Sequence, residues 1–520
     1  MRYLRFLSEM NLRWYKGALI AGVLTALYLP FTLNQKDLLY KSSSLRASCE
    51  ADEYCRANLL LFPLRLIIPH GDVWTYLGPV DYLFSQGRYW EDYRMPGYGV
   101  IYGFFRFLTG DREIAVWLLF FTQVVVWSVA LGLISEELYK RNLPIPFILG
   151  LLILVSFSPA AYYVRVLGTE SLTIAFGLMG IISLLHRAYF IAGILLTWAF
   201  FLRPLHILWI GLGILYLLLV ERRIKPLWAF LAPFFVAEGA WVARNYIHYG
   251  DFRPTSGNGQ LYYSYLYAKY ERYVLDLLRY TGESDPRAVT RGHNLISILY
   301  CHDFHPPTTR EVASMIPKSL RSAKCPPESL HVAATLACEL AHSPSYTPAP
   351  PESSYYGVMD KTLKDFMIYF HPTPEDCEKE LRIEKILKEC VASAEQYYKK
   401  HPLEYIQNLI GHLLHISYAG SHYDRISSQR RLRVKVMYYE IYKWLYFLSI
   451  VLSLYMLLVG GAFERWIAAS GLVILLAYMI LGHLERRYLE TVGPFFLINL
   501  ALAFHRLLVM HTGFFKRALL

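Results

Sequence analysis

The amino-acid sequence predicts an all-α polytopic membrane protein, a bundle of about ten transmembrane helices with a mainly helical extracytoplasmic insertion. Three observations predict this class. Hydrophobic residues make up 55% of the 520 residues and charged residues only 18%, too few charges to cover several soluble domains. Apolar runs close to the length of a bilayer crossing recur along the chain. The formal net charge of +11 is typical of Lys and Arg anchoring helices at the cytoplasmic face, so we expect membrane lipids and no nucleic acid as partners.

The first predicted span covers residues 17–33, after an N-terminal segment that carries Arg2, Arg5, Arg13 and Lys16. Basic residues before a first span place the N-terminus in the cytoplasm. No small-residue cleavage motif follows the apolar run, so we interpret it as an uncleaved span rather than a signal peptide. Residues 34–112 then form the first extracytoplasmic loop.

Six further spans complete an N-terminal transmembrane module, residues 1–243. They are predicted at 114–134, 144–160, 170–186, 189–202, 204–220 and 226–243. The connections expected inside carry Lys140, Arg141, Arg187 and a basic cluster at 222–225, as the positive-inside rule requires. Several spans are shorter than the roughly 20 residues of a full crossing, so the boundaries of one helical hairpin stay open.

Residues 244–438 are polar enough to form an extracytoplasmic helical loop domain, and residues 439–520 form a C-terminal transmembrane module. The last spans are predicted at 440–460, 466–482 and 490–507. A basic cluster at 425–435 precedes the first of these on its predicted outer side. Either the topology reverses there, or the charges meet lipid phosphate at the outer interface. The basic C-terminal tail and the cysteines favour the second alternative.

All seven cysteines fall in the two loops placed outside the membrane. They are Cys49, Cys55, Cys301, Cys325, Cys338, Cys377 and Cys390. This one-sided distribution predicts disulfides in an oxidising compartment. Cys49 and Cys55 are the natural pair, an odd number leaves one cysteine unpaired or intermolecular, and the other connections stay open.

Candidate chemistry gathers near the predicted outer face. The first loop offers Asp72, Asp81 and Asp92, and a carboxylate there can take a proton from an acceptor hydroxyl or amine. Arg203 interrupts apolar sequence, and an arginine at membrane depth indicates function by default. Arg486 and Arg487 lie at the outer end of a span, where the positive-inside rule predicts few cations.

Several short motifs carry a resemblance in their order along the chain. They are RMPGYG (94–99), RVLGTESL (165–172), FLRPL (201–205), WVARNYIHYG (241–250), KKHPLEYIQNLIGHLL (399–414) and HLERRYLETVGPFF (483–496). In this order the chain resembles the polytopic C-class (GT-C) glycosyltransferases. The group it is most similar to is the bacterial dolichyl-phosphate-mannose-protein mannosyltransferase-like group, related to the aminoarabinose transferases of lipid A.

The resemblance implies an inverting transfer of a sugar from a polyprenyl-phosphate donor to a glycan, lipid or protein acceptor. The site would lie at the extracytoplasmic face of a bacterial inner membrane. The family's catalytic acid corresponds to Asp72, but Val73 replaces the second acid of its Asp-Glu pair. Asp81 and Asp92 are the alternatives. The RMPGYG segment is similar to an Arg-x-Pro-Gly-Tyr-Pro stretch and implies substrate contacts for Arg94 and Tyr98.

Further site residues follow from the same resemblance. Arg486, Arg487 and Tyr488 match an Arg-Tyr pair associated with the lipid phosphate, and Arg203 is a further phosphate candidate. Glu170, Arg244 and Asn245 are expected to contact substrate. We name no cofactor and no metal ligands; the cluster CHDFH (301–305) is too tight to supply tetrahedral geometry alone, and a divalent metal stays open.

Two rival functions fit a membrane protein of this kind. A flippase for a lipid-linked glycan should show paired repeats or broken spans at mid-membrane, and we find no repeat. A glycan polymerase or ligase also uses external Arg and His residues, but it takes a diphosphate lipid donor.

Overall fold

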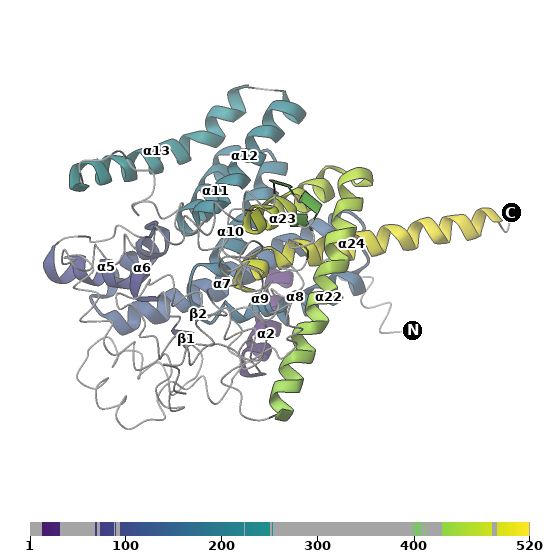
Figure 1. The fold of residues 1–520 in the computed structure, drawn as a ribbon, viewed down its shortest axis with the longest axis horizontal. Coiled ribbons are helices and arrows are strands. Elements are labelled where there is room, and N and C mark those ends of the chain that lie inside the picture. Colours follow the sequence, from purple (N-terminus) through teal and green to yellow (C-terminus); the bar gives the residue numbers. More distant parts are fainter. Residues whose placement is uncertain are drawn as a thin grey trace.

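The computed structural model describes residues 13–31, 68–69, 73–87, 89, 94–222, 224–249, 252, 429–480 and 486–518, with short stretches between 399 and 410. These residues are mostly helical (Figure 1). Six of the described helices are long and apolar enough to cross a membrane, and three shorter ones are equally apolar. The chain is therefore a membrane protein by helix length and composition. The count of about ten spans stays a prediction, as does the insertion at 244–438, most of which lies outside the described residues.

The N-terminal part forms a tight helical pair. Helix α2 (Trp14–Phe31) covers the predicted first span and packs along α7 (Arg112–Lys140). A Cβ on Gly132 would lie 2.3 Å from the Trp14 carbonyl oxygen, so the two backbones touch where only glycine fits. In the sequence, α5 (Val73–Gln86) and α6 (Gly97–Thr109) lie between α2 and α7. The sequence alone predicts only a mixed polar loop for this segment.

The middle of the chain winds through shorter elements. Helix α8 (Ile145–Ser156) and the single turn α9 (Pro159–Tyr162) lead to strand β2 (Val166–Leu167), which pairs in parallel with β1 (Ile68–Pro69) in the register Ile68 to Val166. Helices α10 (Glu170–Leu185) and α11 (Tyr189–Leu202) follow as an antiparallel pair. Both agree with the predicted spans because the apolar runs there end at Arg187 and Arg203.

Pro204 then starts a continuous helical segment made of η1 (Pro204–His206), α12 (Ile207–Tyr216) and the π-turn η2 (Leu217–Glu221). The next helix, α13 (Ile224–Tyr249), packs on α11, and its backbone comes close at Gly193, where a Cβ would lie 2.1 Å from the Phe230 carbonyl oxygen. The rest of α13 is only lightly covered and reaches across one end of the described bundle (Figure 1).

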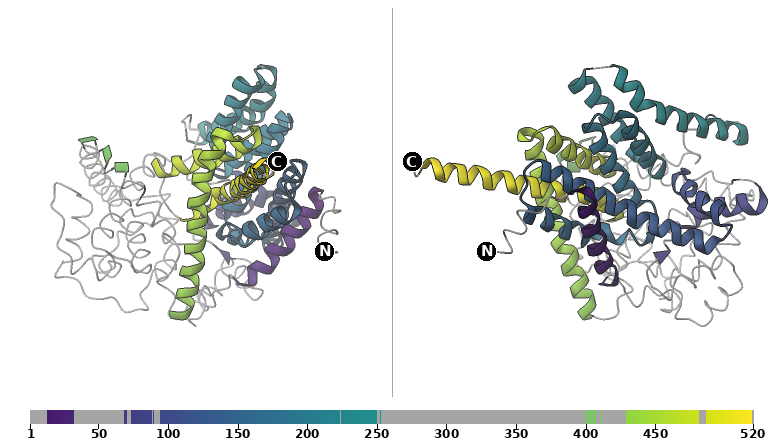
Figure 2. Two further views of the ribbon diagram at one scale, coloured as in Figure 1. Left: turned by 90° about the vertical axis from the view of Figure 1, so that its right-hand side faces the viewer. Right: turned by 180° about the vertical axis from the view of Figure 1, so that it is seen from behind.

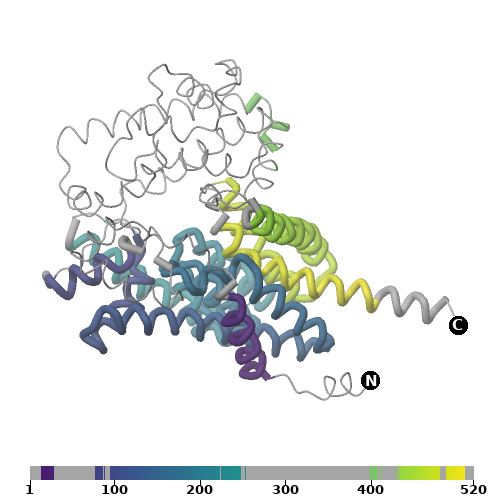
Figure 3. Tube along the Cα trace, turned by 90° about the horizontal axis from the view of Figure 1, so that it is seen from below, coloured from purple at the N-terminus to yellow at the C-terminus, as the bar shows by residue number. Residues whose placement is uncertain are grey.

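Three C-terminal helices close the bundle. They are α22 (Gln429–Val459), α23 (Ala462–Ile480) and α24 (Arg486–Ala518). Helix α24 packs against α22, α23, α10 and α8, and its central residues from Val492 to Ile498 are buried. Figure 3 shows α22 and α24 side by side at one side of the bundle and α5 and α6 at the other. Figure 2 gives the same arrangement in two further views.

Charged groups at the predicted cytoplasmic helix ends meet one another. Glu137 near the end of α7 accepts hydrogen bonds from Arg141 at 3.0 Å and pairs with His186, which follows α10, at 2.8 Å. Arg187 pairs with Glu221 at the end of η2 at 3.1 Å. Because the positive-inside rule assigned Arg141 and Arg187 to the same side, these contacts agree with the alternating helix orientation predicted from the sequence.

Candidate functional site

Arg203 is the centre of a buried polar cluster. The cluster lies at the helix ends opposite those that carry Arg141 and Arg187. Its Nε donates to the Thr169 hydroxyl at 2.9 Å, and its Nη2 forms an ion pair with Glu170. Its Nη1 lies 3.4 Å from the Tyr478 hydroxyl, and its guanidinium carbon lies 5.0 Å from the centre of the Tyr488 ring. The cluster thus joins the ends of four helices: α10, α11, α23 and α24.

Local sequence explains why this arginine leaves its helix here. The residue before a proline is disfavoured in the helical conformation, so Pro204 ends α11 and Arg203 adopts an extended backbone with φ −148° and ψ 109°. Glu170 is the first residue of α10, where a carboxylate also favours the positive end of the helix dipole. The two predicted residues therefore meet because each lies at a helix end on the same side.

An aromatic wall borders the ion pair. The rings of Tyr478 and Tyr488 are stacked with centroids 4.6 Å apart and an interplanar angle of 14°. His206, which is fully buried, lies 4.4 Å from the Trp209 ring and 6.2 Å from the Tyr478 ring. Arg203 therefore has an acid on one side and the face of Tyr488 on another.

Tyr98 of the RMPGYG segment is anchored within electrostatic reach of Glu170. Its hydroxyl donates to Gln123 Oε1 at 2.7 Å, and Gln123 Nε2 donates to the carbonyls of Val164 and Val166 at 2.8 and 3.0 Å. Complete burial, followed by the negative charge of Glu170, raises the pKa of Tyr98 well above its ordinary value. Tyr98 therefore stays a neutral donor that ties α6 and α7 to the strand leading into Glu170.

Gly97 sets how closely α6 approaches the cluster. A Cβ at this position would lie 2.7 Å from the carbonyl carbon and oxygen of Phe201. The start of α6 thus rests directly on the last turn of α11, two residues before Arg203. A glycine is required for this backbone contact.

A second cluster lies beside the first and uses three other predicted residues. Arg244 donates to the Tyr89 carbonyl at 2.8 Å and to Asn245 Oδ1 at 2.9 Å, and its guanidinium lies over the rings of Tyr89 and Trp241 at 5.4 and 4.9 Å. It fixes the first loop to α13. Arg94 lies over the Tyr76 ring at 5.1 Å, and that ring meets the edge of Tyr98.

Asp81 lies apart from the Arg203 cluster, on α5. Its Oδ1 accepts a hydrogen bond from the Tyr102 hydroxyl at 2.7 Å, and its Oδ2 pairs with Arg112 Nε at 3.0 Å. Burial, together with the adjacent Asp81 charge, raises the pKa of Tyr102. Because the carboxylate is paired with a cation and a phenol, it joins α5, α6 and α7.

The remaining predicted residues are only partly placed. Asp72 and Asp92 lie outside the described residues, as do all seven cysteines and the CHDFH segment. Arg486 and Arg487 form the start of α24, directly before Tyr488, although their side chains are not described. In the described part of the chain no three His, Cys, Asp or Glu residues gather as a metal site would need.

Three members of the cluster were not predicted from the sequence. Gln123 is a lone amide in an apolar span, and that isolation is a detectable sign of a buried hydrogen-bond role. Thr169 precedes Glu170 and accepts from Arg203, but a threonine before a helix is too common to single out. Tyr478 is one of 42 tyrosines, and only its place at a helix end distinguishes it.

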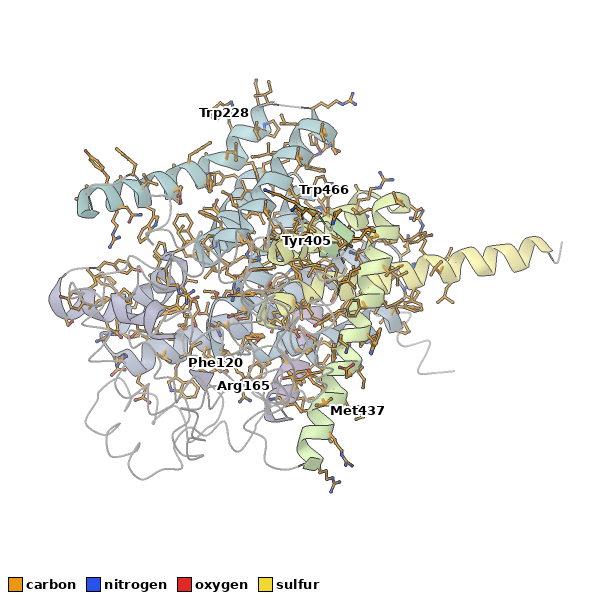
Figure 4. All side chains as sticks on the ribbon, in the orientation of Figure 1. Phe120, Arg165, Trp228, Tyr405, Met437 and Trp466 are labelled. Carbon is orange, nitrogen blue, oxygen red and sulfur yellow. The ribbon has the colours of Figure 1, made fainter. Side chains whose placement is uncertain are left out.

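The comparisons with known proteins add no relative. No family model, curated protein or solved structure matches the chain. Figure 4 shows the described side chains on these helices, with Phe120 on α7, Arg165 directly before β2 and Trp466 on α23 among those labelled. The proposal below therefore depends on the residues and their contacts.

Proposed function

We propose that this protein is an inverting glycosyltransferase that moves a sugar from a polyprenyl-phosphate donor to an acceptor at the outer face of the membrane. The observation that carries the proposal is the meeting of Glu170, Arg203 and Tyr488 in one buried cluster, with Tyr98 anchored within electrostatic reach of Glu170. These residues come from four motifs that the sequence resemblance singled out, and they are far apart along the chain.

The charges indicate how a donor would bind. Glu170 already compensates the Arg203 guanidinium, so the pair offers little net attraction for a phosphate. Arg486 and Arg487 stand in the first turn of α24, next to Tyr488. Guanidinium groups and the free N–H groups of a helix start both favour an anion. In this proposal the lipid phosphate binds there, and Arg203 holds Glu170 and Tyr488 in position.

The chemistry needs one proton acceptor. An acceptor hydroxyl attacks the anomeric carbon from the side opposite the phosphate, the carbon–oxygen bond to the phosphate breaks, and the configuration inverts. A carboxylate takes the hydroxyl proton. We assign this role to Asp72, which directly precedes α5 in the sequence. Asp81 fits the role poorly because Arg112 and Tyr102 occupy its oxygens, and Asp92 is the remaining alternative.

The location follows from the donor. Nucleotide sugars are confined to the cytoplasm, so an enzyme acting on the other side of the membrane requires a sugar that arrives on a lipid. The candidate cluster joins helix ends opposite the basic cytoplasmic ends at Arg141 and Arg187. We place the reaction at the periplasmic face of a bacterial inner membrane, with a glycan, lipid or protein as the acceptor.

The test compares two synthetic donors that carry the same sugar on a polyprenyl monophosphate or a polyprenyl diphosphate. The purified protein in nanodiscs is titrated with each, and donor affinity and sugar transfer are measured. The proposal expects tighter binding and turnover with the monophosphate. It also expects Arg486→Lys or Arg487→Lys to weaken monophosphate binding about tenfold to a hundredfold, and Arg486→Gln/Arg487→Gln nearly to abolish it. Turnover with the diphosphate alone would identify a polymerase or ligase instead.

A further inference from the structure

Helix α22 is longer than a membrane span needs to be. Its 31 residues extend about 46 Å, against a hydrocarbon core of about 30 Å. The apolar span within α22 begins at Arg433. The first turn of the helix, from Gln429, therefore lies just outside the apolar span. Figure 4 labels Met437 on the N-terminal half of α22.

One face of this half is a continuous exposed apolar stripe. Met437, Ile441, Trp444 and Leu448 are spaced by three or four residues, so they share one face of the helix. They are 59%, 52%, 60% and 44% exposed. Together with Glu440 and Leu445 they line a shallow groove of about 420 Å³. The opposite tyrosines, Tyr438 and Tyr442, point inward and donate to the carbonyls of Phe157 and Leu154.

Cations stand directly above the groove on the same face. Arg430 and Arg433 precede Met437 by seven and four residues, both are exposed, and this spacing aligns them with the stripe. The acid in the groove wall, Glu440, is neutralised by Lys443 at 2.5 Å. An anion that enters from the Arg430 end therefore meets two guanidinium groups and no unpaired carboxylate among the groove residues.

The dimensions match one leaflet. Met437 and Leu448 are separated by about 16 Å along the helix, and half of a bilayer core is about 15 Å thick. A lipid acyl chain lying along the stripe would reach from the membrane interface to the membrane centre. The lipid phosphate would then lie one helical turn before Met437, beside Arg433. Such an arrangement of cations above an apolar surface is typical of anionic lipid sites.

We propose that this groove is a binding site for an anionic glycerophospholipid, with its phosphate at Arg430 and Arg433 and one acyl chain along Met437, Ile441, Trp444 and Leu448. A second copy of the chain is a poorer occupant, because parallel two-fold pairing through this face would bring each arginine against its own copy. The glycosyl donor is also a poorer occupant, since its proposed site lies at the start of α24, beside Tyr488 and Arg203.

Trp444 lies in the groove and reports on its occupant. The full-length protein is placed in vesicles of phosphatidylglycerol and phosphatidylcholine of one fixed composition, with bromine on the acyl chains of only one of the two lipids. The Trp444 signal is the fluorescence that Trp444→Phe removes. We expect it to be quenched at least twofold more when phosphatidylglycerol carries the bromine. Arg430→Gln/Arg433→Gln should abolish that preference.

The matched control is Arg222→Gln/Lys225→Gln, which removes two exposed charges near the start of α13 and should leave the preference unchanged. Equal quenching by both lipids, or a preference that survives Arg430→Gln/Arg433→Gln, would overturn the site. Absence of quenching by either lipid would mean that protein covers the groove. Loss of the preference on adding one equivalent of polyprenyl phosphate would assign the groove to the donor lipid.

Discussion

Arg203 connects four helices through one side chain, because its guanidinium reaches Thr169, Glu170 and Tyr478 and lies over the face of Tyr488. A guanidinium suits this position better than an ammonium, since its planar fork directs separate N–H groups to separate partners. A buried pair of this kind is costly to break on one side, because the remaining charge is left without compensation.

Removing both partners of the pair should therefore cost less than the sum of the costs of removing each alone. Glu170→Gln and Arg203→Gln are each expected to lower the free energy of unfolding by about 3–5 kcal/mol. The double variant should be less destabilised than the sum by at least about 1 kcal/mol. Unfolding by denaturant in mild detergent gives the four values of the cycle.

The control cycle uses Glu136 and Lys140, a pair at 2.8 Å on α7 in which Lys140 is exposed and Glu136 is half-buried. Its coupling should stay near 0.3–0.5 kcal/mol, about the usual worth of such helix-surface pairs. If Glu170 and Arg203 couple no more strongly than this control pair, the cluster does not depend on their charges.

Replacing the candidate acids one at a time should distinguish a catalytic carboxylate, which affects sugar transfer, from a structural one, which affects stability. Asp72→Asn is expected to preserve donor binding and thermal stability but to lower transfer by about 10² or more, if the carboxylate takes the acceptor proton. Asp81→Asn should instead lower the melting temperature, because it loses the ion pair with Arg112. Donor titration, melting curves and turnover on both variants make the comparison. Full turnover by Asp72→Asn would move the role to Asp81 or Asp92.

Helix positions were the part of the fold that sequence predicted best. The predicted spans 170–186 and 189–202 agree with α10 and α11 within one residue, because Arg187 and Pro204 interrupt a steady apolar run. Helices α5 and α6 were not predicted, since aromatic and polar residues alternate there without a long apolar stretch. The pairing of β1 with β2 depends on contacts between segments far apart in sequence, which no local pattern reveals.

The contact between α6 and α11 gives a test at the scale of the element. Gly97→Ala places a methyl group against the Phe201 carbonyl, and the helices must separate, at a cost of about 1–3 kcal/mol. Gly150→Ala is the matched control on α8, where no other atom lies within 4 Å of the new Cβ. It should be neutral or slightly stabilising. The melting temperatures of the two variants are compared with that of the wild type. Equal changes in melting temperature would mean that α6 does not rest on α11.

The candidate site itself was partly predictable. Glu170 and Arg203 were chosen separately, one as an acid at a helix start and one as an arginine at membrane depth, and the fold brings them into contact. Asp81 was chosen by its position in the first loop, but the sequence could not reveal that Arg112 and Tyr102 occupy it. Gln123 and Tyr478 required the packing of α7 and α23 to be known.

At the scale of the whole molecule, the proposed orientation places the Arg203 cluster at the outer face of the membrane. The cysteines test that orientation independently, because all seven belong to loops predicted outside. After reduction, a membrane-impermeant thiol reagent should label the protein in intact cells. Labelling that appears only when the cytoplasmic face is opened would reverse the topology and move the Arg203 cluster to the cytoplasmic side.

The most direct test of the proposed function is to identify the lipid that the protein releases. Purified protein is incubated with a lipid and envelope extract of its own cells, and mass spectrometry follows the polyprenyl carriers, so neither the sugar nor the acceptor has to be known. We predict that polyprenyl monophosphate accumulates with wild type and not with Asp72→Asn. Accumulation of polyprenyl diphosphate, or movement of intact sugar lipid across vesicles with no carrier released, would contradict glycosyl transfer from a monophosphate donor.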